Sequence, residues 1–473
     1  MTGRVGRRAA AAVLAVVTVT AVLGVASQAE ASAAQLLRYP YLTDVTGPNA
    51  TVSWATDRSA GTGYATYGAV GRESCTAHRA NGSKTAITVG STPEYQWKAR
   101  IIGLAPDTAY CYRVFFSTPT VDLLGADASP QFTTLPPAGS TGSFSFAVVG
   151  DWGQVDAAGA NPDQANVMTR LAGSGARFVL GAGDTAYPAG SQTNYGDLAQ
   201  VGANTSAVFG PSFWKPVGAS MPLYNALGNH GLTGTFPMVW PQTATTAASG
   251  GRYAMETYCC TNGTSSKSYP SAWYAFDAGR ARIYVLDATW SNSNVGTADL
   301  YKNDYDNHWT PSSPQYQWLA ADLAASTAPL KIAVFHFPMY SDNATEKSDP
   351  YLTGPGSVAE LLSSHGTDLV FNGHAHMYQR NTRIGADSFV SYVTGGGGGT
   401  LEPIGGKGCS PTDAYGIGWS NSSSRGSRCG AAPTPIAKAQ VFHFLLVTVT
   451  GTGVTVAPTN SLGQAFDVQT YAF

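Results

Sequence analysis

The stretch LVFNGHAHMYQR, residues 369–380, largely decides how this chain is interpreted. A short apolar run ends at a glycine, and two histidines, His374 and His376, follow with one alanine between them. In an extended segment residues i and i+2 point the same way, so both imidazoles can reach one cluster. The pair indicates a metal site only if other parts of the chain supply further ligands.

Four other apolar runs end in the same manner, and each is followed by a polar residue of a kind that can bind a metal ion. They are FAVVGDWG with Asp151, FVLGAGDTAY with Asp184 and Tyr187, PLYNALGNHG with Asn229 and His230, and IAVFHFP with His336. Apolar runs that alternate with partly helical stretches predict an α/β layered domain. Ligands of such folds bind at the carboxyl ends of the strands, so we expect these side chains to converge on one edge.

The expected donors are two carboxylates, a carboxamide, a phenol and three imidazoles with a fourth beside them, which exceeds what one ion needs. The set suits two ions held ~3.5–4 Å apart, and nitrogen and oxygen ligands without thiolate suit Fe, Zn or Mn. The phenol of Tyr187 is a hard anionic ligand that favours Fe(III) at one position. The sequence therefore predicts a dinuclear centre of Fe(III) and a divalent ion (Zn, Mn or Fe).

Residues 34–136 have a different pattern, in which apolar and polar residues alternate and Gly, Pro and Asn separate the runs. Trp54 on an early strand and a turn before Tyr110 resemble a fibronectin type III sandwich. Residues 137–143 are rich in Gly, Ser and Thr and predict a linker. We therefore expect an all-β domain over residues 34–136 and a larger α/β domain over residues 144–473.

In this order, GDWG, GDTAY, GNH, VFHF and GHAH resemble the motifs of the purple acid phosphatases, which belong to the metallophosphoesterase superfamily. The preceding sandwich resembles the plant-type architecture of that family. The resemblance implies an α/β (α+β sandwich) metallophosphoesterase domain preceded by an all-β fibronectin III-like sandwich. It also implies an acid phosphatase that hydrolyses phosphate monoesters of small phosphorylated substrates, through attack of a metal-bound hydroxide.

The resemblance assigns a role to each motif residue. It implies that Asp151, Tyr187 and His376 bind Fe(III), and that Asp184 bridges the two ions. It implies that Asn229, His336 and His374 bind the divalent ion. His230 is expected beside the substrate phosphate as a catalytic residue, with Asn229 also at the substrate.

Three positions depart from the family pattern. Gly231 stands where an acidic residue often follows GNH, and Gln379 replaces a commonly acidic position. The stretch FPMYSDNATEKSD after His336 has no histidine, although plant-type members carry histidines there that contact phosphate and can protonate the leaving group. The general acid is therefore open, with His230 as one option. A phosphodiesterase acting on nucleotides or phospholipid headgroups stays an alternative, and a non-catalytic binding module is the rival from another class.

The charge of the chain limits the classes of partner, and its N-terminal segment indicates where the protein is located. Charged residues make up 12% of the 473 residues, the formal net charge is -2, and no basic run suits nucleic-acid binding. Arginines at positions 4, 7 and 8, an apolar run over residues 9–26 and small residues after it predict a cleaved signal peptide over residues 1–31. We expect a secreted protein without stable membrane insertion, an uncleaved anchor being the alternative. A monomer is the default expectation.

Six cysteines in an exported chain predict disulfides. Cys75 with Cys111 and Cys409 with Cys429 are favoured because each pair stays within one region. The adjacent Cys259 and Cys260 are then left over, and each could instead cross to Cys409 or Cys429.

Overall fold

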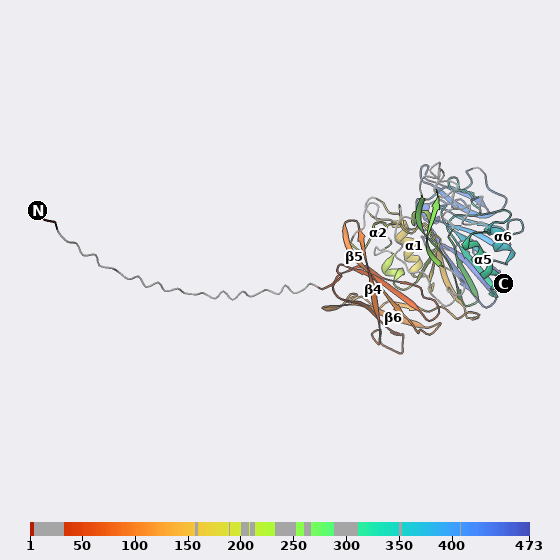
Figure 1. Cartoon of the computed structure of the whole chain (residues 1–473). Helices are drawn as coiled ribbons and strands as arrows, with labels where there is room; N and C mark the ends of the chain where they lie inside the picture. Colours follow the sequence, from red (N-terminus) through yellow and green to blue (C-terminus); the bar gives the residue numbers. More distant parts are fainter. Residues whose placement is uncertain are drawn as a thin grey trace. The chain divides into compact units, whose positions relative to one another are not determined.

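The computed structural model describes the chain except residues 4–32, 157–158, 189, 200–207, 209–212, 232–251, 260–265, 288–310, 350–351 and 407. Met1–Ala33 is a unit of its own, and Ala34–Phe473 is the compact unit that contains the described helices and strands (Figure 1). The predicted signal peptide lies almost wholly outside the described residues. Within the described part of the chain, no helix is long and apolar enough to cross a membrane.

The first strands form an antiparallel domain. Its eight strands are β1 (Leu36–Thr43), β2 (Ala50–Thr56), β3 (Gly63–Ala69), β4 (His78–Val89), β5 (Thr92–Ile101), β6 (Ala109–Ser117), β7 (Thr120–Asp122) and β8 (Gln131–Thr133). Trp54 of β2 is fully buried and stacks on Trp97 of β5, with ring centroids 6.5 Å apart. The hydroxyl of Tyr110 accepts the backbone N–H of Ala105 at 2.9 Å, which fixes the turn before β6.

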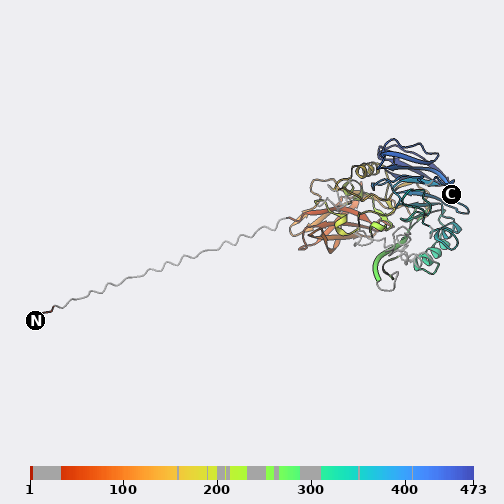
Figure 2. The same cartoon turned by 90° about the horizontal axis from the view of Figure 1, so that it is seen from above.

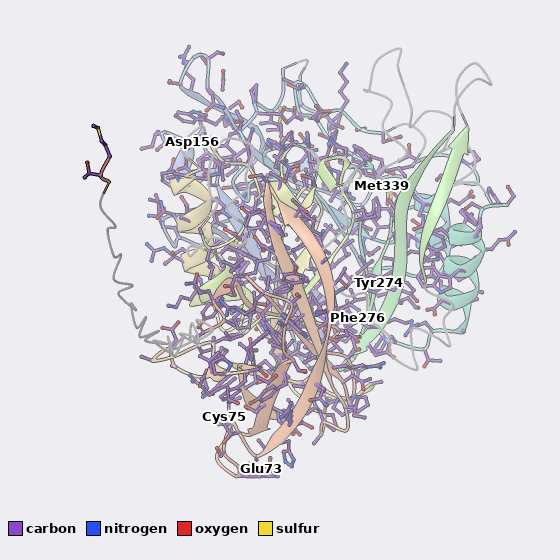
Figure 3. All side chains as sticks on the ribbon, turned by 60° about the vertical axis from the view of Figure 1, so that its left-hand side comes forward. Glu73, Cys75, Asp156, Tyr274, Phe276 and Met339 are labelled. Carbon is purple, nitrogen blue, oxygen red and sulfur yellow. A yellow bond between two sulfur atoms is a disulfide. The ribbon has the colours of Figure 1, made fainter. Side chains whose placement is uncertain are left out.

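Two disulfides are formed as the sequence predicts. Cys75 bonds Cys111 in the β domain, where Figure 3 shows Cys75 near Glu73 at one end of this domain, and Cys409 bonds Cys429. Each bond closes a loop within one region of the chain and so restricts the unfolded state. The alternative pairings of Cys259 or Cys260 with these cysteines are wrong, because both partners are already bonded. The side chains of Cys259 and Cys260 lie outside the described residues.

Two further sheets build the larger domain. The six-stranded sheet has the order β11-β10-β9-β21-β22-β23 and comprises β9 (Phe144–Val149), β10 (Val179–Gly181), β11 (Leu223–Asn225), β21 (His443–Val449), β22 (Gly453–Asn460) and β23 (Gln469–Ala472). The nine-stranded sheet has the order β12-β13-β14-β15-β16-β18-β17-β19-β20. It comprises β12 (Arg252–Cys259), β13 (Ser266–Ala278), β14 (Ala281–Val285), β15 (Leu330–Val334), β16 (Leu369–Asn372), β17 (Tyr378–Asn381), β18 (Val390–Thr394), β19 (Asp413–Ser420) and β20 (Arg425–Gly430).

Several central strands of both sheets run parallel, as is common in α/β layered domains. Strand β10 pairs in parallel with β9 and β11, and β14, β15, β16 and β18 pair in parallel in that order. Alternate side chains of these strands enter two cores. Ile283 and Val285 of β14 join the core between the sheets, which also holds Tyr274 and Phe276 of β13 (Figure 3), whereas Tyr284 faces the helices.

The described helices are short and capped by the residues before them. They are α1 (Pro162–Ala172), α2 (Gln192–Tyr195), α5 (Pro314–Ala325) and α6 (Val358–Ser364), with single turns η1 (Trp214–Gly218), η2 (Asn229–Gly231) and η4 (Lys438–Gln440). Ser313 caps α5 and Ser357 caps α6 through their hydroxyls. Helix α5 buries Leu319 and Leu323 against the nine-stranded sheet. Figure 2 shows α5 and α6 in teal and the last strands in blue on different sides of the unit.

A buried arginine joins the β domain to the larger domain. Arg38 of β1 is fully buried, and its guanidinium donates to the Gly196 carbonyl at 3.0 Å and to Gln192 Oε1 at 2.7 Å. Glu94 of β5, also fully buried, lies 3.9 Å from Arg38 Nε. Burial raises the pKa of the Glu94 carboxyl to about 8, Asp197 adds to the rise, and Arg38 opposes it.

The raised pKa of Glu94 makes stability depend on pH. In the folded state Glu94 keeps its proton up to about pH 8, whereas in the unfolded state it loses the proton near pH 4.5. The contribution of this carboxyl to stability is therefore fully present below pH 4.5 and is lost as the pH rises through 8. We expect Glu94→Gln to flatten the fall of stability between those values by up to ~1.4 kcal/mol per pH unit. Unfolding midpoints at several pH values measure this, and Glu360→Gln, at an exposed position of α6, should keep the wild-type slope. An unchanged slope in Glu94→Gln contradicts the prediction.

Candidate metal centre

The predicted ligands lie at the carboxyl ends of β9, β10, β11, β15 and β16, drawn from both sheets of the larger domain. Three of them have a left-handed backbone: φ is 58° at Asp151, 53° at Asp184 and 69° at His374. Asp and His adopt this conformation more readily than most residues, and it costs on the order of 1 kcal/mol or more at each position. The conformation turns each side chain sharply off its strand, toward the gap where the two sheets meet.

Backbone contacts hold these turns together across the two sheets. Asp151 Oδ2 accepts the backbone N–H of His374 at 2.8 Å, and the N–H of Asp151 donates to the Gly183 carbonyl at 3.1 Å. Gly373 allows this approach, because a Cβ there would lie 2.5 Å from the Ala182 carbonyl oxygen and 2.6 Å from Asp151 Oδ2. The ends of β9, β10 and β16 are therefore locked to one another directly behind the donor atoms.

One half of the donor cluster surrounds the phenol of Tyr187. Its Oη lies 3.1 Å from His376 Nε2, 3.1 Å from Asp184 Oδ2 and 3.4 Å from Asp151 Oδ1. His376 Nε2 also lies 3.4 Å from Asp151 Oδ1, while its Nδ1 donates to the Thr400 carbonyl at 2.8 Å. Because Nδ1 donates to the carbonyl, Nε2 is the nitrogen that faces the phenol and the carboxylates. Four different donor atoms thus face one small space.

The other half of the cluster surrounds the carboxamide of Asn229. Its Oδ1 lies 2.9 Å from His336 Nε2 and 3.2 Å from His374 Nδ1. His336 is fully buried, and its Nδ1 donates to the Ala182 carbonyl at 2.7 Å, which again leaves Nε2 to face the cluster. Donor atoms of Asp184, His336 and His374 all lie within 4.8 Å of one another.

Asp184 belongs to both halves. Its Oδ2 faces Tyr187, and its Oδ1 lies 3.3 Å from His336 Nε2 and accepts the backbone N–H of His230 at 2.8 Å. A glycine at position 228 is required here, because a Cβ would overlap Asp184 Oδ1. One buried carboxylate therefore presents one oxygen to each group of donors.

Electrostatics bind the cluster together even without an ion. Burial tends to lower the pKa of His336, but the Asp184 carboxylate outweighs it and raises the pKa to about 9. Burial likewise tends to lower the pKa of His376, but the hydrogen bond and the charge of Asp151 outweigh it and raise the pKa to about 9. Burial, Asp184 and Asp151 together hold the pKa of the Tyr187 phenol well above its usual value. A cation that enters must displace these protons.

His230 lies at the mouth of the cluster. Its Nδ1 donates to the Pro188 carbonyl at 2.5 Å, and its ring packs on that of Tyr187 with centroids 4.2 Å apart. The carbonyl fixes Nδ1 as the donor, which leaves Nε2 available to a ligand. The structure thus brings together all eight residues singled out in the sequence.

Comparisons with known proteins agree on one family. Residues 144–378 match the model of the calcineurin-like phosphoesterases, and residues 40–134 match that of the purple acid phosphatase N-terminal domain. Together these models cover most of the chain in the order that the family has. The chain belongs to the purple acid phosphatase family. Its fold is accordingly that of an N-terminal β domain followed by a calcineurin-like phosphoesterase domain.

Several named relatives are plant purple acid phosphatases. Purple acid phosphatase 23 of Arabidopsis thaliana is 25% identical over 326 residues, which are 64% of this chain and 62% of that protein. Purple acid phosphatase 15 of the same plant is 34% identical over 122 residues, 25% of this chain and 20% of that protein. The alignments thus span less than two thirds of these relatives. The structure of a purple acid phosphatase from yellow lupin (Lupinus luteus) superposes with a TM-score of 0.64 at 17% identity, over 93% of this chain and 74% of that one, which shows a shared fold.

Two glutamates beside the cluster are not predicted by the sequence motifs. Glu346 Oε2 lies 2.9 Å from His374 Nε2, and Glu402 Oε2 accepts the backbone N–H of His376 at 3.1 Å. Glu346 belongs to the stretch in which purple acid phosphatases of the plant type were expected to carry histidines. Neither glutamate stands in a strand-end motif, so its position became visible only when the loops were placed.

Gln379, the other departure, is structural in this chain. It is buried, its amide nitrogen donates to Asp413 and to Asn381 Oδ1, and its Oε1 accepts the N–H of Asp342 at 2.9 Å. An amide can donate and accept at once, which a carboxylate cannot. Gln379 therefore ties the loop after β15 to strands β17 and β19.

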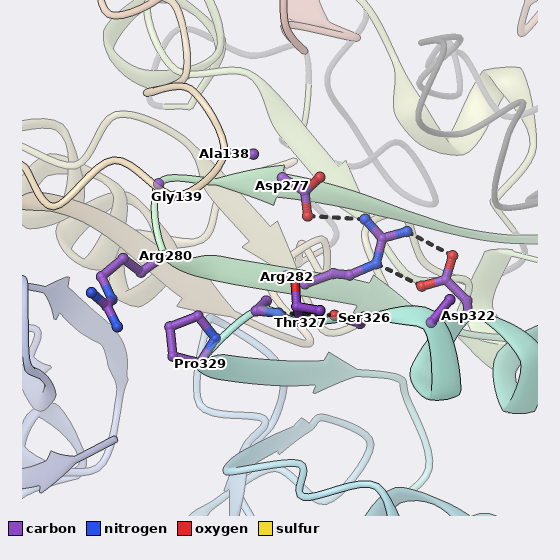
Figure 4. A pocket seen from close by; sticks show the side chains of 12 residues that line it. Ala138, Gly139, Asp277, Arg280, Arg282, Asp322, Ser326, Thr327 and Pro329 are labelled. Atoms are coloured by element: carbon purple, nitrogen blue, oxygen red, sulfur yellow. Dashed lines mark hydrogen bonds and ion pairs between the residues drawn. The ribbon is translucent and has the colours of Figure 1, made fainter.

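A cavity of about 410 Å³ lies at the other ends of the strands, where β14 and β15 begin (Figure 4). Arg282 lines it and pairs with Asp322 at 2.6 Å and Asp277 at 2.9 Å, as the dashed lines of Figure 4 show. These charges satisfy one another and keep Arg282 protonated. The cavity contains none of the predicted ligands, so the metal centre and this cavity are separate features.

The close approach at Gly373 gives a direct test of how the cluster is held. We expect Gly373→Ala to push Asp151 away from the His374 amide and to lower the metal content of the purified protein by at least half, because the added methyl overlaps both the Ala182 carbonyl and the carboxylate. Elemental analysis checks this. Gly142→Ala, where the nearest atom to a Cβ is 3.6 Å away, is the matched control and should retain the wild-type content. A normal metal content in Gly373→Ala contradicts the prediction.

Proposed function

We propose that this protein is a secreted, metal-dependent acid phosphatase that hydrolyses phosphate monoesters at a centre of Fe(III) and a divalent ion. The observation that supports this most strongly is Asp184, which turns one oxygen to the Tyr187 group and the other to the His336 group. A carboxylate with a donor group on each side suits two neighbouring ions. The cysteines bonded as disulfides are consistent with an exported protein.

The donor chemistry fits two different ions. Asp151, Tyr187 and His376 would hold Fe(III), because a phenolate and a carboxylate are hard anions, and Asn229, His336 and His374 would hold Zn, Mn or Fe(II) with neutral donors. Asp184 would bridge them. When bound, the ions supply Lewis acidity toward phosphoryl oxygens and activate water as a nucleophile. The division into a fibronectin-like domain (34–136), a linker (137–143) and a catalytic domain (144–473) is part of this proposal.

Residues of the chain itself would bind and orient the substrate phosphate. His230, fixed by the Pro188 carbonyl, would present Nε2 to the phosphate and can deliver a proton to the leaving oxygen. Asn229 would also contact the substrate. The buried Asp151 and Asp184 hold the positive charge of the centre in place, so that a phosphate anion is attracted to the open side where His230 lies.

The first experiment combines elemental analysis, visible spectroscopy and hydrolysis of p-nitrophenyl phosphate by the purified full chain. A purple protein with about two metal ions per chain that hydrolyses the monoester supports the whole proposal. A colourless protein with two Zn or Mn ions would support a metal-dependent hydrolase but contradict the assignment of iron to Tyr187. A metal-free protein that cannot be reconstituted contradicts the enzyme and favours the binding module.

The phenol of Tyr187 gives a specific prediction. If Tyr187 binds Fe(III) as a phenolate, Tyr187→Phe should abolish the visible band, because the charge transfer from oxygen to iron is lost, and should lower kcat at least ~10-fold. Tyr471→Phe, a hydroxyl on remote β23 that bonds Tyr392, is the control and should keep both the band and the rate. A visible band of wild-type intensity in Tyr187→Phe refutes the assignment.

The altered loop after His336 keeps a phosphodiesterase as the second candidate, since it carries Glu346 where histidines were expected. The two candidates differ in the rate ratio between p-nitrophenyl phosphate and bis(p-nitrophenyl) phosphate. We expect kcat/KM for the monoester to exceed that for the diester by at least ~10-fold, because the two ions neutralise a dianion better than a monoanion. A ratio below one favours the diesterase.

A further inference from the structure

The loop over residues 337–349, which follows β15 and His336, is built around Asn343. The side-chain Oδ1 of Asn343 accepts the backbone N–H groups of Thr345 at 2.7 Å and Glu346 at 2.9 Å. The hydroxyl of Ser341 donates to the Glu346 carbonyl at 2.7 Å. Both backbone polar groups of Glu346 are thus fixed by side chains of the same loop, so that little freedom is left at this residue.

The loop is also tied to the strands that carry the donor cluster. Asn343 Nδ2 donates to Glu402 Oε2 at 2.9 Å, and the same oxygen accepts the backbone N–H of His376 at 3.1 Å. Asn343 further pairs with Ile404 in a β-bridge. The position of Glu346 is therefore set relative to the segment of His374 and His376, not only within its own loop.

Glu346 contacts the one imidazole whose outer nitrogen is not satisfied by a backbone carbonyl. His336 and His376 each donate Nδ1 to a carbonyl, whereas His374 turns Nδ1 toward Asn229 and buries Nε2. Glu346 Oε2 lies 2.9 Å from this Nε2, and among the residues that the structure describes no hydrogen bond reaches it. His374 is 7% exposed and Glu346 23%, so solvent reaches the carboxylate more than the imidazole.

We propose that Glu346 is a positioning residue for His374. Its negative charge, 2.9 Å from Nε2, favours the tautomer that carries the proton on Nε2 and so leaves the lone pair of Nδ1 for the divalent ion. The inference rests on the proposed function, since it concerns one of the two metal positions of that centre.

Zinc binding tests the inference without relying on activity. The metal-free full chain is titrated with Zn²⁺ against a chromogenic chelator, for the wild type, Glu346→Gln and Glu346→Ala. We expect two ions to bind the wild type, and Glu346→Ala to weaken one of the two ~10–100-fold while the other is unchanged. The zinc affinity of Glu346→Gln should fall between those of the wild type and Glu346→Ala, because its amide oxygen keeps a partial negative charge near Nε2 but not the full charge of the carboxylate.

Controls separate this role from a structural one. Glu360→Gln removes a carboxylate from the first turn of α6, where it accepts the Gly356 N–H, and should leave both zinc affinities unchanged. The unfolding midpoint of each metal-free variant shows that it is folded, and Glu346→Gln carries the test if Glu346→Ala does not fold. Folded variants with both wild-type affinities, or an equal loss at both positions, overturn the inference. A wild type that binds fewer than two ions overturns the proposed function instead.

Discussion

The structure depends on the hydrogen bond from the His374 backbone N–H to Asp151 Oδ2, at 2.8 Å. It joins the end of β9 in one sheet to the end of β16 in the other, and both residues adopt a left-handed backbone to make it. Such conformations cost on the order of 1–3 kcal/mol each and persist only where the surroundings determine them. Here the two packed sheets supply that determination. The donor cluster therefore requires both sheets to be in place.

This arrangement explains why the cluster is charged yet buried. Asp151 and Asp184 are almost completely inaccessible, and without an ion they are balanced by protons on His336 and His376, whose pKa values rise to about 9. Binding of cations exchanges those protons for metal charge, so affinity must fall as the pH falls. The site is therefore prepared for cations by the same carboxylates that would otherwise destabilise the core.

Much of this could be predicted because local patterns carried it. Apolar runs ending in glycine and a ligand residue located the strand ends, and the disulfides Cys75–Cys111 and Cys409–Cys429 were predicted because both partners lie in one region. Interactions between distant loops could not be found in this way. Arg38 and Glu94 are charged residues on strands, which a sequence pattern places at the surface, yet both are fully buried between the domains. Glu346 meets His374 only because Asn343 and Glu402 fix a loop that has no periodic pattern.

The charge of Glu346 bears on substrate choice beyond its contact with His374. A partly exposed carboxylate beside the donor cluster repels a phosphate dianion more than a monoanion, whereas an imidazole in that region would attract both. The proposed divalent ion on the far side of the His374 imidazole would offset this repulsion, because its positive charge opposes that of the carboxylate. In the proposed centre, substrate preference would thus depend on the balance between the metal charge and Glu346. Metal content alone would therefore not distinguish a monoesterase from a diesterase, since the seven proposed ligands serve either reaction.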